Sequence, residues 1–391
     1  MPLSQTCLHD NHVRLGAKMV DFAGWHMPIQ YTSIVSEHNA VRERVGIFDV
    51  SHMGQIFVSG KEASSFLSYV TTWDINKLSD GDCRYCHILN NDGQIIDDTI
   101  VYTFSNQDYM LVPNASMISK VFDWLNLNSS NFEVNIYNKS EEFFCLAVQG
   151  PESLRLLRQY FNLSITPFKL IKSDNLIISG TGYTGEKGYE IYVIDAHENA
   201  EKVWNGVLEA GEEFGLMVIA PAHHRRIAAG ILSWGQDLDH ESSPFQVNLA
   251  YQVPRNKKAD YIGKEELERQ RDVIDSGNFP FKMKMVGITL GGKEITDYAP
   301  DFWLIADSDG KDVGYITSPW WSPELETNIA LAWVPWTLSE VGTKLQVRLP
   351  DEYSEESGVA VQAEVVEVPF RESVNPNKRE VQKEKGLDYA D

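Results

Sequence analysis

The stretch Tyr85-Cys-His-Ile-Leu-Asn-Asn-Asp-Gly-Gln-Ile-Ile-Asp-Asp-Thr-Ile-Val-Tyr-Thr-Phe104 decides the first part of the fold, because it predicts a β-hairpin. Residues 85–89 and 95–104 form two apolar runs, and the turn residues 90–93 separate them. Asp97 and Asp98 interrupt the second run. Since side chains alternate along a strand, one carboxylate should point toward the interior and the other away from it.

Two interpretations of this acidic pair follow from the sequence. A partly buried carboxylate costs free energy unless it binds something. Both carboxylates could accept backbone hydrogen bonds close to the turn. Alternatively, one of them is a pocket acid or hydrogen-bond acceptor with a shifted pKa. The sequence by itself leaves both interpretations open.

Outside the hairpin, strands and helices alternate without a repeat, which indicates an α+β body. We expect helices over 34–44, 153–161 and 196–214. After residue 276 only short apolar runs separated by turn residues remain, and they predict a small all-β barrel or sandwich of about ninety residues. These runs cover 285–290, 302–306, 312–317, 329–334, 344–349 and 361–368.

Composition limits the class of protein. The 391 residues exceed what one hydrophobic core usually supports, so we expect two or three packed units. Lys and Arg number 34 against 56 for Asp and Glu, and the net charge of -22 repels nucleic acids and anionic lipids. No leader peptide and no run of eighteen apolar residues is found, so we expect a cytoplasmic protein without a membrane partner.

Four cysteines in a chain of this length predict no disulfide framework. Cys83-Arg-Tyr-Cys86 has the spacing of half a zinc site, but no second pair with ligand spacing follows it. We therefore expect no metal site.

Gly182-Tyr-Thr-Gly-Glu-Lys-Gly-Tyr-Glu190 predicts a sharply turned loop in which glycines let the backbone approach a ligand. Tyrosine rings beside it could stack on a planar heterocycle, while Glu190 pairs with ring amino and amide hydrogens. A plain glycine turn with core tyrosines explains the same residues equally well.

Two other polar segments are less specific. Asp49, Ser51 and His52 are adjacent along one strand, so their side chains diverge and do not predict a catalytic triad. The run His223-His224-Arg225-Arg226 could bind an anion or a metal, but neighbouring helical side chains point about 100° apart. Such a run more commonly forms a helix surface that contacts substrate or solvent.

These blocks resemble the aminomethyltransferase family, the T-proteins of the glycine cleavage system. The specific strings are Lys18-Met-Val-Asp-Phe-Ala-Gly-Trp25 and Asp49-Val-Ser-His-Met-Gly54, and the likeness runs from about Leu8 to Phe370. The resemblance implies a three-lobed cloverleaf. Two intertwined α+β lobes in residues 1–278 would surround the folate, a C-terminal β-barrel would cover 279–370, and a polar tail would follow in 371–391.

The resemblance also implies roles for single residues. Asp98 is similar in position to the family's catalytic aspartate. Five further positions match those that line the tetrahydrofolate pocket in relatives, namely Tyr85, Tyr102, Asn114, Tyr183 and Glu190. We further expect Arg226, His223 and Trp234 to contact the substrate.

The chain departs from the family at Ala220-Pro-Ala-His-His-Arg-Arg-Ile-Ala228. A glycine cleavage enzyme typically reads Gly-Ala-Arg-Asp-x-x-Arg-Leu-Glu there, so Ala222 and Ala228 replace an arginine and a glutamate. Loss of both charges alters what the pocket recognises. This segment and the Cys83 to Cys86 segment are also similar to the folate-dependent dimethylsulfoniopropionate demethylase branch.

Three functions therefore remain open. The one-carbon donor could be the aminomethyl group on the lipoyl arm of the glycine cleavage H-protein, or a small methylated sulfonium or amine. The third is folate binding without turnover, as in relatives with a Lys-Gly-Cys-Tyr-x-Gly-Gln-Glu motif, which residues 230–237 lack.

Overall fold

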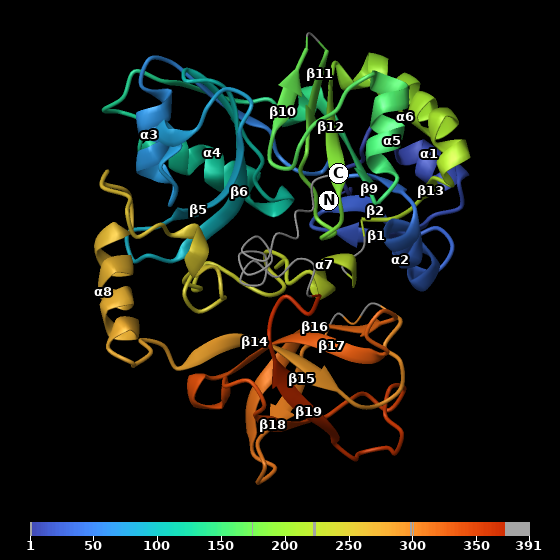
Figure 1. The fold of residues 1–391 in the computed structure, drawn as a ribbon, viewed down its shortest axis with the longest axis vertical. Helices are drawn as coiled ribbons and strands as arrows, with labels where there is room; N and C mark the ends of the chain where they lie inside the picture. The colour runs from blue at the N-terminus through green and yellow to red at the C-terminus, as the bar shows by residue number, and fades with distance from the viewer. Residues whose placement is uncertain (1, 174, 222–223, 298, 300, 372–391) are drawn as a thin grey trace, which may run out of the picture.

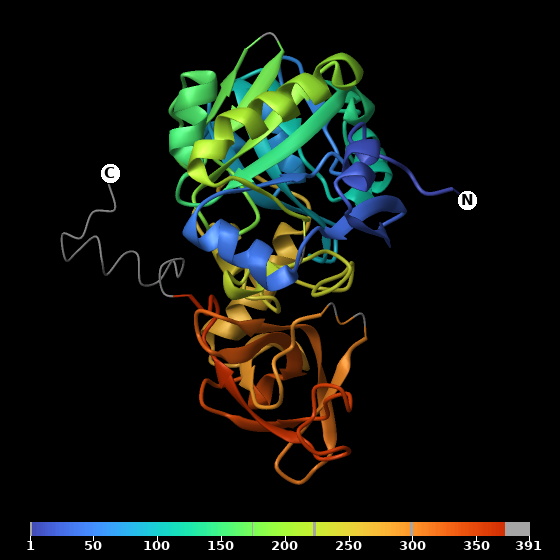
Figure 2. The same cartoon turned by 90° about the vertical axis from the view of Figure 1, so that its right-hand side faces the viewer.

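The computed structural model describes residues 2–173, 175–221, 224–297, 299 and 301–371. The described chain forms three units, two α+β lobes side by side and a barrel below them (Figure 1). The view at right angles shows the barrel at one end of an elongated molecule (Figure 2). The predicted polar tail lies outside the described residues, apart from Arg371. None of the described helices has the length and apolar character needed to cross a membrane.

The first lobe contains a five-stranded sheet of order β5-β6-β7-β4-β8. Helices α3 and α4 pack their apolar residues against one of its faces. The predicted hairpin is present, with residues 90–93 as its turn, and its register pairs Tyr85 with Ile100 and His87 with Asp98. The elements are β4 (Ile56–Ser59), α3 (Ala63–Val70), η1 (Ile75–Lys77), β5 (Cys83–Leu89), β6 (Ile95–Ser105), β7 (Asp108–Leu111), η2 (Ala115–Met117), α4 (Ile118–Leu127) and β8 (Asn135–Asn138).

The second lobe contains a six-stranded sheet of order β10-β11-β12-β9-β3-β13. Strand β3 comes from the N-terminal part of the chain, so the two lobes are interleaved in sequence. The elements are α1 (His9–Arg14), β1 (Lys18–Phe22), β2 (Trp25–Gln30), α2 (Ile34–Glu43), β3 (Gly46–Asp49), η3 (Ser140–Glu142), β9 (Phe143–Gln149), α5 (Ser153–Phe161), β10 (Leu170–Lys172), β11 (Leu176–Ser179), β12 (Gly188–Ile194), α6 (Ala196–Gly211), η4 (Glu212–Phe214) and β13 (Met217–Val218).

The C-terminal strands close into a barrel of order β14-β17-β16-β15-β18-β19, so the barrel prediction is confirmed over the sandwich. The α+β architecture is confirmed as well. The barrel strands are β14 (Met283–Leu290), β15 (Trp303–Ala306), β16 (Asp312–Ser322), β17 (Thr327–Pro335), β18 (Lys344–Val347) and β19 (Val361–Val366), with η6 (Trp336–Leu338) after β17. Along the chain, α7 (His224–Ala228), η5 (Ala250–Gln252) and α8 (Lys264–Asp275) follow the second lobe and precede the barrel.

The two lobe sheets share one apolar cluster. It joins Cys83 and Tyr102 of the first sheet to Cys145 and Tyr192 of the second. The backbone also connects the lobes, because the amide of Cys83 donates to the carbonyl of Phe168 over 2.8 Å. The strand faces of the two lobes are therefore held against each other.

A buried ion pair connects α7, the turn that follows it and the barrel. Arg226 and Asp237 are both 0% exposed, and the Arg226 Nη1 lies 2.5 Å from the Asp237 Oδ2. Arg226 also donates to the Ser318 hydroxyl over 2.9 Å. Thr317 and Ser318 of β16 each donate to the Asp237 Oδ1 over 2.6 Å. Removal of one partner of such a pair is costly, because it strands a buried charge.

We predict that Arg226→Met destabilises the protein by about 3–5 kcal/mol, because Asp237 would remain buried and charged without its partner. The midpoint of urea unfolding measures this. The double variant Arg226→Met/Asp237→Asn removes the stranded charge and should regain part of the loss. A single variant as stable as the parent would contradict this account of the junction.

Candidate functional site

Three of the predicted site residues converge at the hairpin. The Tyr85 hydroxyl donates to the Asp98 Oδ2 over 2.8 Å. The Asn114 side-chain amide donates to the Asp98 Oδ1 over 3.0 Å. Tyr85 and Asp98 lie on neighbouring strands, and Asn114 follows β7 at the start of η2. Both carboxylate oxygens of Asp98 are thus oriented by side chains from other segments.

The two neighbouring aspartates divide the roles that the sequence left open. Asp97 is 0% exposed and accepts the Asn114 backbone amide over 3.0 Å and its side-chain amide over 2.8 Å. Asp98 is partly exposed. Asp97 therefore has the structural role near the backbone, while Asp98 lies on the opposite face of the strand, where a ligand could reach it.

Burial controls the protonation of this group. It raises the pKa of the Asp98 carboxyl above its ordinary value. It also raises the pKa of Asp97, with the negative charge of Asp98 as a second cause. The pKa of the Tyr85 hydroxyl is raised by burial and then by the Asp98 charge, so this hydroxyl remains a donor.

Glu190 forms a second polar group on β12. Its Oε2 accepts hydroxyls from Thr181 over 2.5 Å, from Tyr102 over 2.9 Å and from Tyr192 over 3.1 Å. Tyr102 belongs to the first lobe, so this carboxylate links the two sheets. Among the hydrogen bonds of the described residues, none reaches the Oε1 atom. One oxygen of a preoriented carboxylate is therefore open to a ligand.

The two groups lie on strands of the two lobe sheets that pack against each other. Asp98 and Tyr102 are four residues apart on one face of β6, which corresponds to about 13 Å along the strand. Tyr183 is partly buried nearby, and its hydroxyl donates to the carbonyl of Leu232 over 3.5 Å. Asp98 is one of the charges that affect the pKa of Tyr183. The predicted tyrosines, Asn114 and Glu190 are thus compatible with one binding site.

The glycine loop differs from the expectation that its glycines bring the backbone to a ligand. An added Cβ at Gly182 or Gly188 would collide with the side chain of Gln149. Gln149 in turn accepts the Thr184 hydroxyl over 2.8 Å and donates to the Thr181 carbonyl over 3.1 Å. These two glycines therefore make room for a buried amide, and only Gly185, at φ 73°, requires a left-handed turn.

An ion cluster connects the glycine loop to the barrel and to the end of the described chain. Arg42 of α2 donates to the Thr184 carbonyl over 2.7 Å and to Glu186 over 3.1 Å. Arg371 lies 2.6 Å from Glu186 and 2.9 Å from Glu324. Since Glu324 follows β16, the loop is held by α2, by the barrel and by the end of the described chain, and these contacts fix its position relative to the barrel.

Of the residues expected to contact the substrate, the two that the structure describes have their contacts outside the Asp98 group. The Arg226 guanidinium is occupied by Asp237 and Ser318 and has no exposed surface. Trp234 is partly buried between the apolar clusters of the first lobe and of the barrel junction. His223 lies outside the described residues. A substrate contact of these three residues stays a prediction.

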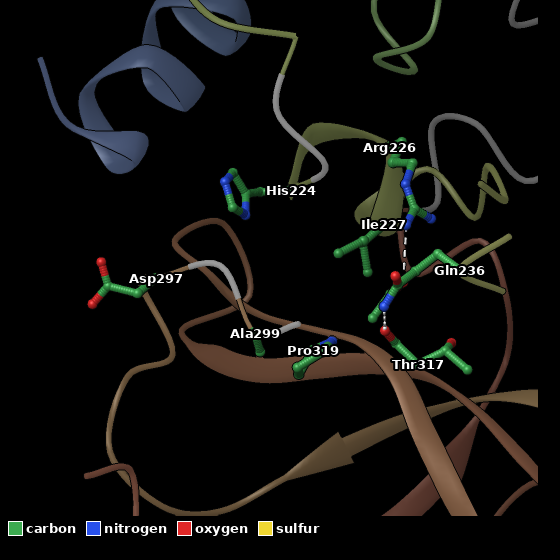
Figure 3. Close-up of a pocket in the computed structure, with 9 residues that line it drawn as sticks. His224, Arg226, Ile227, Gln236, Asp297, Ala299, Thr317 and Pro319 are labelled. Carbon is green, nitrogen blue, oxygen red and sulfur yellow. Dashed lines mark hydrogen bonds between the residues drawn. The ribbon is translucent and has the colours of Figure 1, made fainter. Parts of the chain in front are cut away.

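A separate pocket lies between α7 and β16 (Figure 3). Arg226, Gln236 and Thr317 stand on one side of it, with His224 and Asp297 on the other. The Gln236 amide donates to the Thr317 carbonyl, which holds this wall in place. No sequence pattern pointed to Asp297 or Gln236, because they come from distant turns. None of the residues that line the pocket belongs to the group around Asp98.

The discounted triad is absent from the described residues. The Ser51 hydroxyl donates to Asp49 over 2.5 Å, and the other Asp49 oxygen lies 2.9 Å from the His12 Nε2. Ser51 therefore contacts the carboxylate rather than the histidine imidazole that a catalytic triad requires, and the arrangement does not activate it as a nucleophile.

Comparisons with known proteins identify the family of the chain. A family profile described as the GCVT N-terminal domain matches residues 8–257, and the glycine cleavage T-protein C-terminal barrel domain matches residues 284–371. An aminomethyltransferase of Chloroherpeton thalassium is 36% identical over 94% of this chain and 99% of its own length. One of Thermotoga maritima is 38% identical over 94% of this chain and 98% of its own length.

Among solved structures, glycine cleavage system aminomethyltransferase T from Bartonella henselae is similar with a TM-score of 0.83 and 28% identity. The match covers 95% of this chain and 99% of that chain. Family profiles over most of the chain, full-length relatives and the shared fold lead to one conclusion: the chain belongs to the glycine cleavage T-protein family of tetrahydrofolate-dependent aminomethyltransferases.

Proposed function

We propose that this enzyme takes the one-carbon unit from an aminomethyl group on the lipoyl arm of an H-protein and passes it to tetrahydrofolate as a methylene group, with release of ammonia and with the lipoyl arm left as its dithiol. The observation that carries the proposal is the Asp98 carboxylate, held at both oxygens by Tyr85 and Asn114. Glu190 supports it with an open oxygen in the space between the lobes. The relatives reported above are named aminomethyltransferases.

The residues present fit tetrahydrofolate. Its pterin has an amino and amide edge that pairs with a carboxylate, and the Glu190 Oε1 is such an acceptor. Its flat ring suits the partly exposed faces of Tyr85 and Tyr183, whereas the buried Tyr102 contributes through its hydrogen bond to Glu190. When bound, tetrahydrofolate supplies the nitrogen nucleophile that accepts the one-carbon unit.

Asp98 has the role of catalytic residue in this proposal. The carboxylate orients the nitrogen nucleophile and stabilises the positive charge that develops during transfer. Asn114 and the Tyr85 hydroxyl keep its two oxygens in a fixed plane. Asp97 behind them anchors Asn114, so that the whole arrangement is set before the substrates arrive.

The cellular setting is part of the proposal. We infer a cytoplasmic enzyme, since the four cysteines are free thiols, as is usual in a reducing compartment. H-protein is the proposed partner because it carries the donor. The acidic surface, with a net charge of -22, disfavours nucleic-acid phosphates and anionic lipid as partners.

One observation favours the second donor, a small methylated sulfonium or amine. Ala228 is buried in the apolar cluster at the barrel junction, beside Ile227 and Leu232. A glutamate, which the family typically has there, would place a charge in this cluster. Its absence makes that part of the chain less polar than in a typical glycine cleavage enzyme.

An assay with purified protein separates the two donors. Tetrahydrofolate is offered with lipoylated H-protein carrying the aminomethyl group, or with a panel of methylated sulfonium and amine compounds. Methylenetetrahydrofolate and ammonia from the first mixture support the proposal. Methyltetrahydrofolate from the second mixture alone would assign the demethylase function, and no product with any donor would reject both.

Asp98→Asn should lower kcat about 100-fold or more, because the amide keeps the shape of the carboxylate but not its charge. Folate affinity, measured by calorimetry, should stay within a few-fold of the parent. Asp123→Asn on the surface of α4 is a matched control. Unchanged turnover in the Asp98 variant would remove this residue from the catalytic role.

The pH dependence of turnover follows from the direction of the pKa shift. Burial raises the Asp98 pKa above the ordinary value of 3.8, so the carboxylate form is lost at a higher pH than in an exposed aspartate. If the carboxylate is the active form, kcat should fall as the pH decreases through this raised pKa. An acid limb at or below 3.8 would contradict the assignment.

Glu190→Gln should raise the Kd for tetrahydrofolate about tenfold or more, because the amide lacks the negative charge that strengthens the hydrogen bonds from the pterin edge. Binding is followed by fluorescence quenching, and Glu198→Gln in α6 serves as the exposed control. Equal affinity of parent and variant would show that the pterin does not lie against Glu190.

A further inference from the structure

His87 is a buried side chain that the proposed mechanism does not use. It lies in β5 two residues from Tyr85, so both side chains are on the same face of the strand. The hairpin register places it directly opposite Asp98. Opposite residues of an antiparallel pair have Cβ atoms about 4.5–5.5 Å apart, so His87 and Asp98 are direct neighbours.

The imidazole contacts the donor of the Asp98 hydrogen bond. The His87 and Tyr85 rings meet edge to face, with centroids 5.6 Å apart and an interplanar angle of 74°. The Tyr85 hydroxyl donates to Asp98 over 2.8 Å. The position of the His87 ring therefore limits how Tyr85 can turn, and hence where its hydroxyl meets the carboxylate.

The buried imidazole of His87 also lowers the stability of the fold. Its side chain is 0% exposed, and within the described part of the chain neither Nδ1 nor Nε2 has a hydrogen-bond partner. Burial lowers its pKa to about 3, so the ring is neutral at physiological pH. A buried polar atom without a partner destabilises the fold. An apolar side chain of similar size would avoid this cost.

We propose that His87 is a positioning residue of the Asp98 site, which fixes the Tyr85 ring and places a neutral polar edge beside the carboxylate at the expense of stability. The inference rests on the proposed function and extends it by one residue. Retention of costly polar groups is expected where function, and not folding, selects the side chain.

The protonation of Asp98 depends on every titratable group around it. These groups are Tyr85, Cys86 and His87 on β5, Asp97 on β6, Tyr183 on the glycine loop and Tyr251 on η5. Replacement of the imidazole by an apolar group leaves the carboxylate in less polar surroundings. Its charged form is then disfavoured further, and its pKa rises.

The test is His87→Leu. We expect a higher midpoint of unfolding, kcat lowered about tenfold, and an acid limb of kcat displaced to higher pH, with KM for tetrahydrofolate little changed. His87→Gln keeps a donor and an acceptor, so its acid limb should stay closer to the parent than that of the leucine variant.

Thr103→Val is the matched control. The Thr103 hydroxyl is also buried and has no partner among the residues that the structure describes, and it lies on the face of β6 opposite Asp98. Its replacement should raise stability without any change in the pH profile. A leucine variant that is less stable, or as active as the parent with an unmoved acid limb, would overturn the role of His87. If Asp98→Asn also left turnover unchanged, the proposed function itself would fail.

Discussion

The buried ion pair of Arg226 and Asp237 is the interaction on which the position of the barrel against the α7 segment depends. It lies where α7, the following turn and the barrel strand β16 meet, with hydroxyls from Thr317 and Ser318 around it. A pair of this kind adds little net stability compared with apolar packing, but it tolerates only one geometry. The barrel is thereby held in one orientation against α7 and the turn that follows it.

The packing of the two lobe sheets against each other matters as well, because the site draws on both lobes. Asp98 and Tyr85 come from the first sheet and Glu190 from the second, and the Tyr102 hydroxyl joins the two. Burial keeps Tyr85 protonated and raises the pKa of Asp98, so the site combines a reliable donor with a carboxylate of increased basicity. His87, whose buried ring has no hydrogen-bond partner among the described residues, lies beside Asp98 as well.

Local signals made the hairpin predictable, since the residues of its turn and strands are contiguous. The alternation of side chains along β6 also distinguishes Asp97 from Asp98, and this follows from the order of the residues alone. The environment of Glu190 was harder to predict from the sequence, because sheet packing brings together its partners Thr181, Tyr192 and Tyr102. Only the shared face of Glu190 and Tyr192, two residues apart, could have indicated part of it.

The glycine loop shows how a correct pattern can have a different cause. Three glycines predicted a turn, but two of them accommodate Gln149 from β9, a contact across the sheet that no local rule contains. Arg226 is similar. The sequence suggested that the Arg226 cation contacts a substrate. In the structure its partner is Asp237, which lies in the turn that follows α7 and is equally buried.

Strand β3, residues Gly46–Asp49, has a consequence for how this protein is made. The strand is fully buried between β9 and β13, whose residues follow about a hundred and more positions later. During synthesis the strands of the first lobe, residues 56–138, are complete while β3 still lacks its neighbours β9 and β13. The nascent chain therefore presents an apolar edge until residue 218 has left the ribosome, and this interval is when a chaperone would be needed.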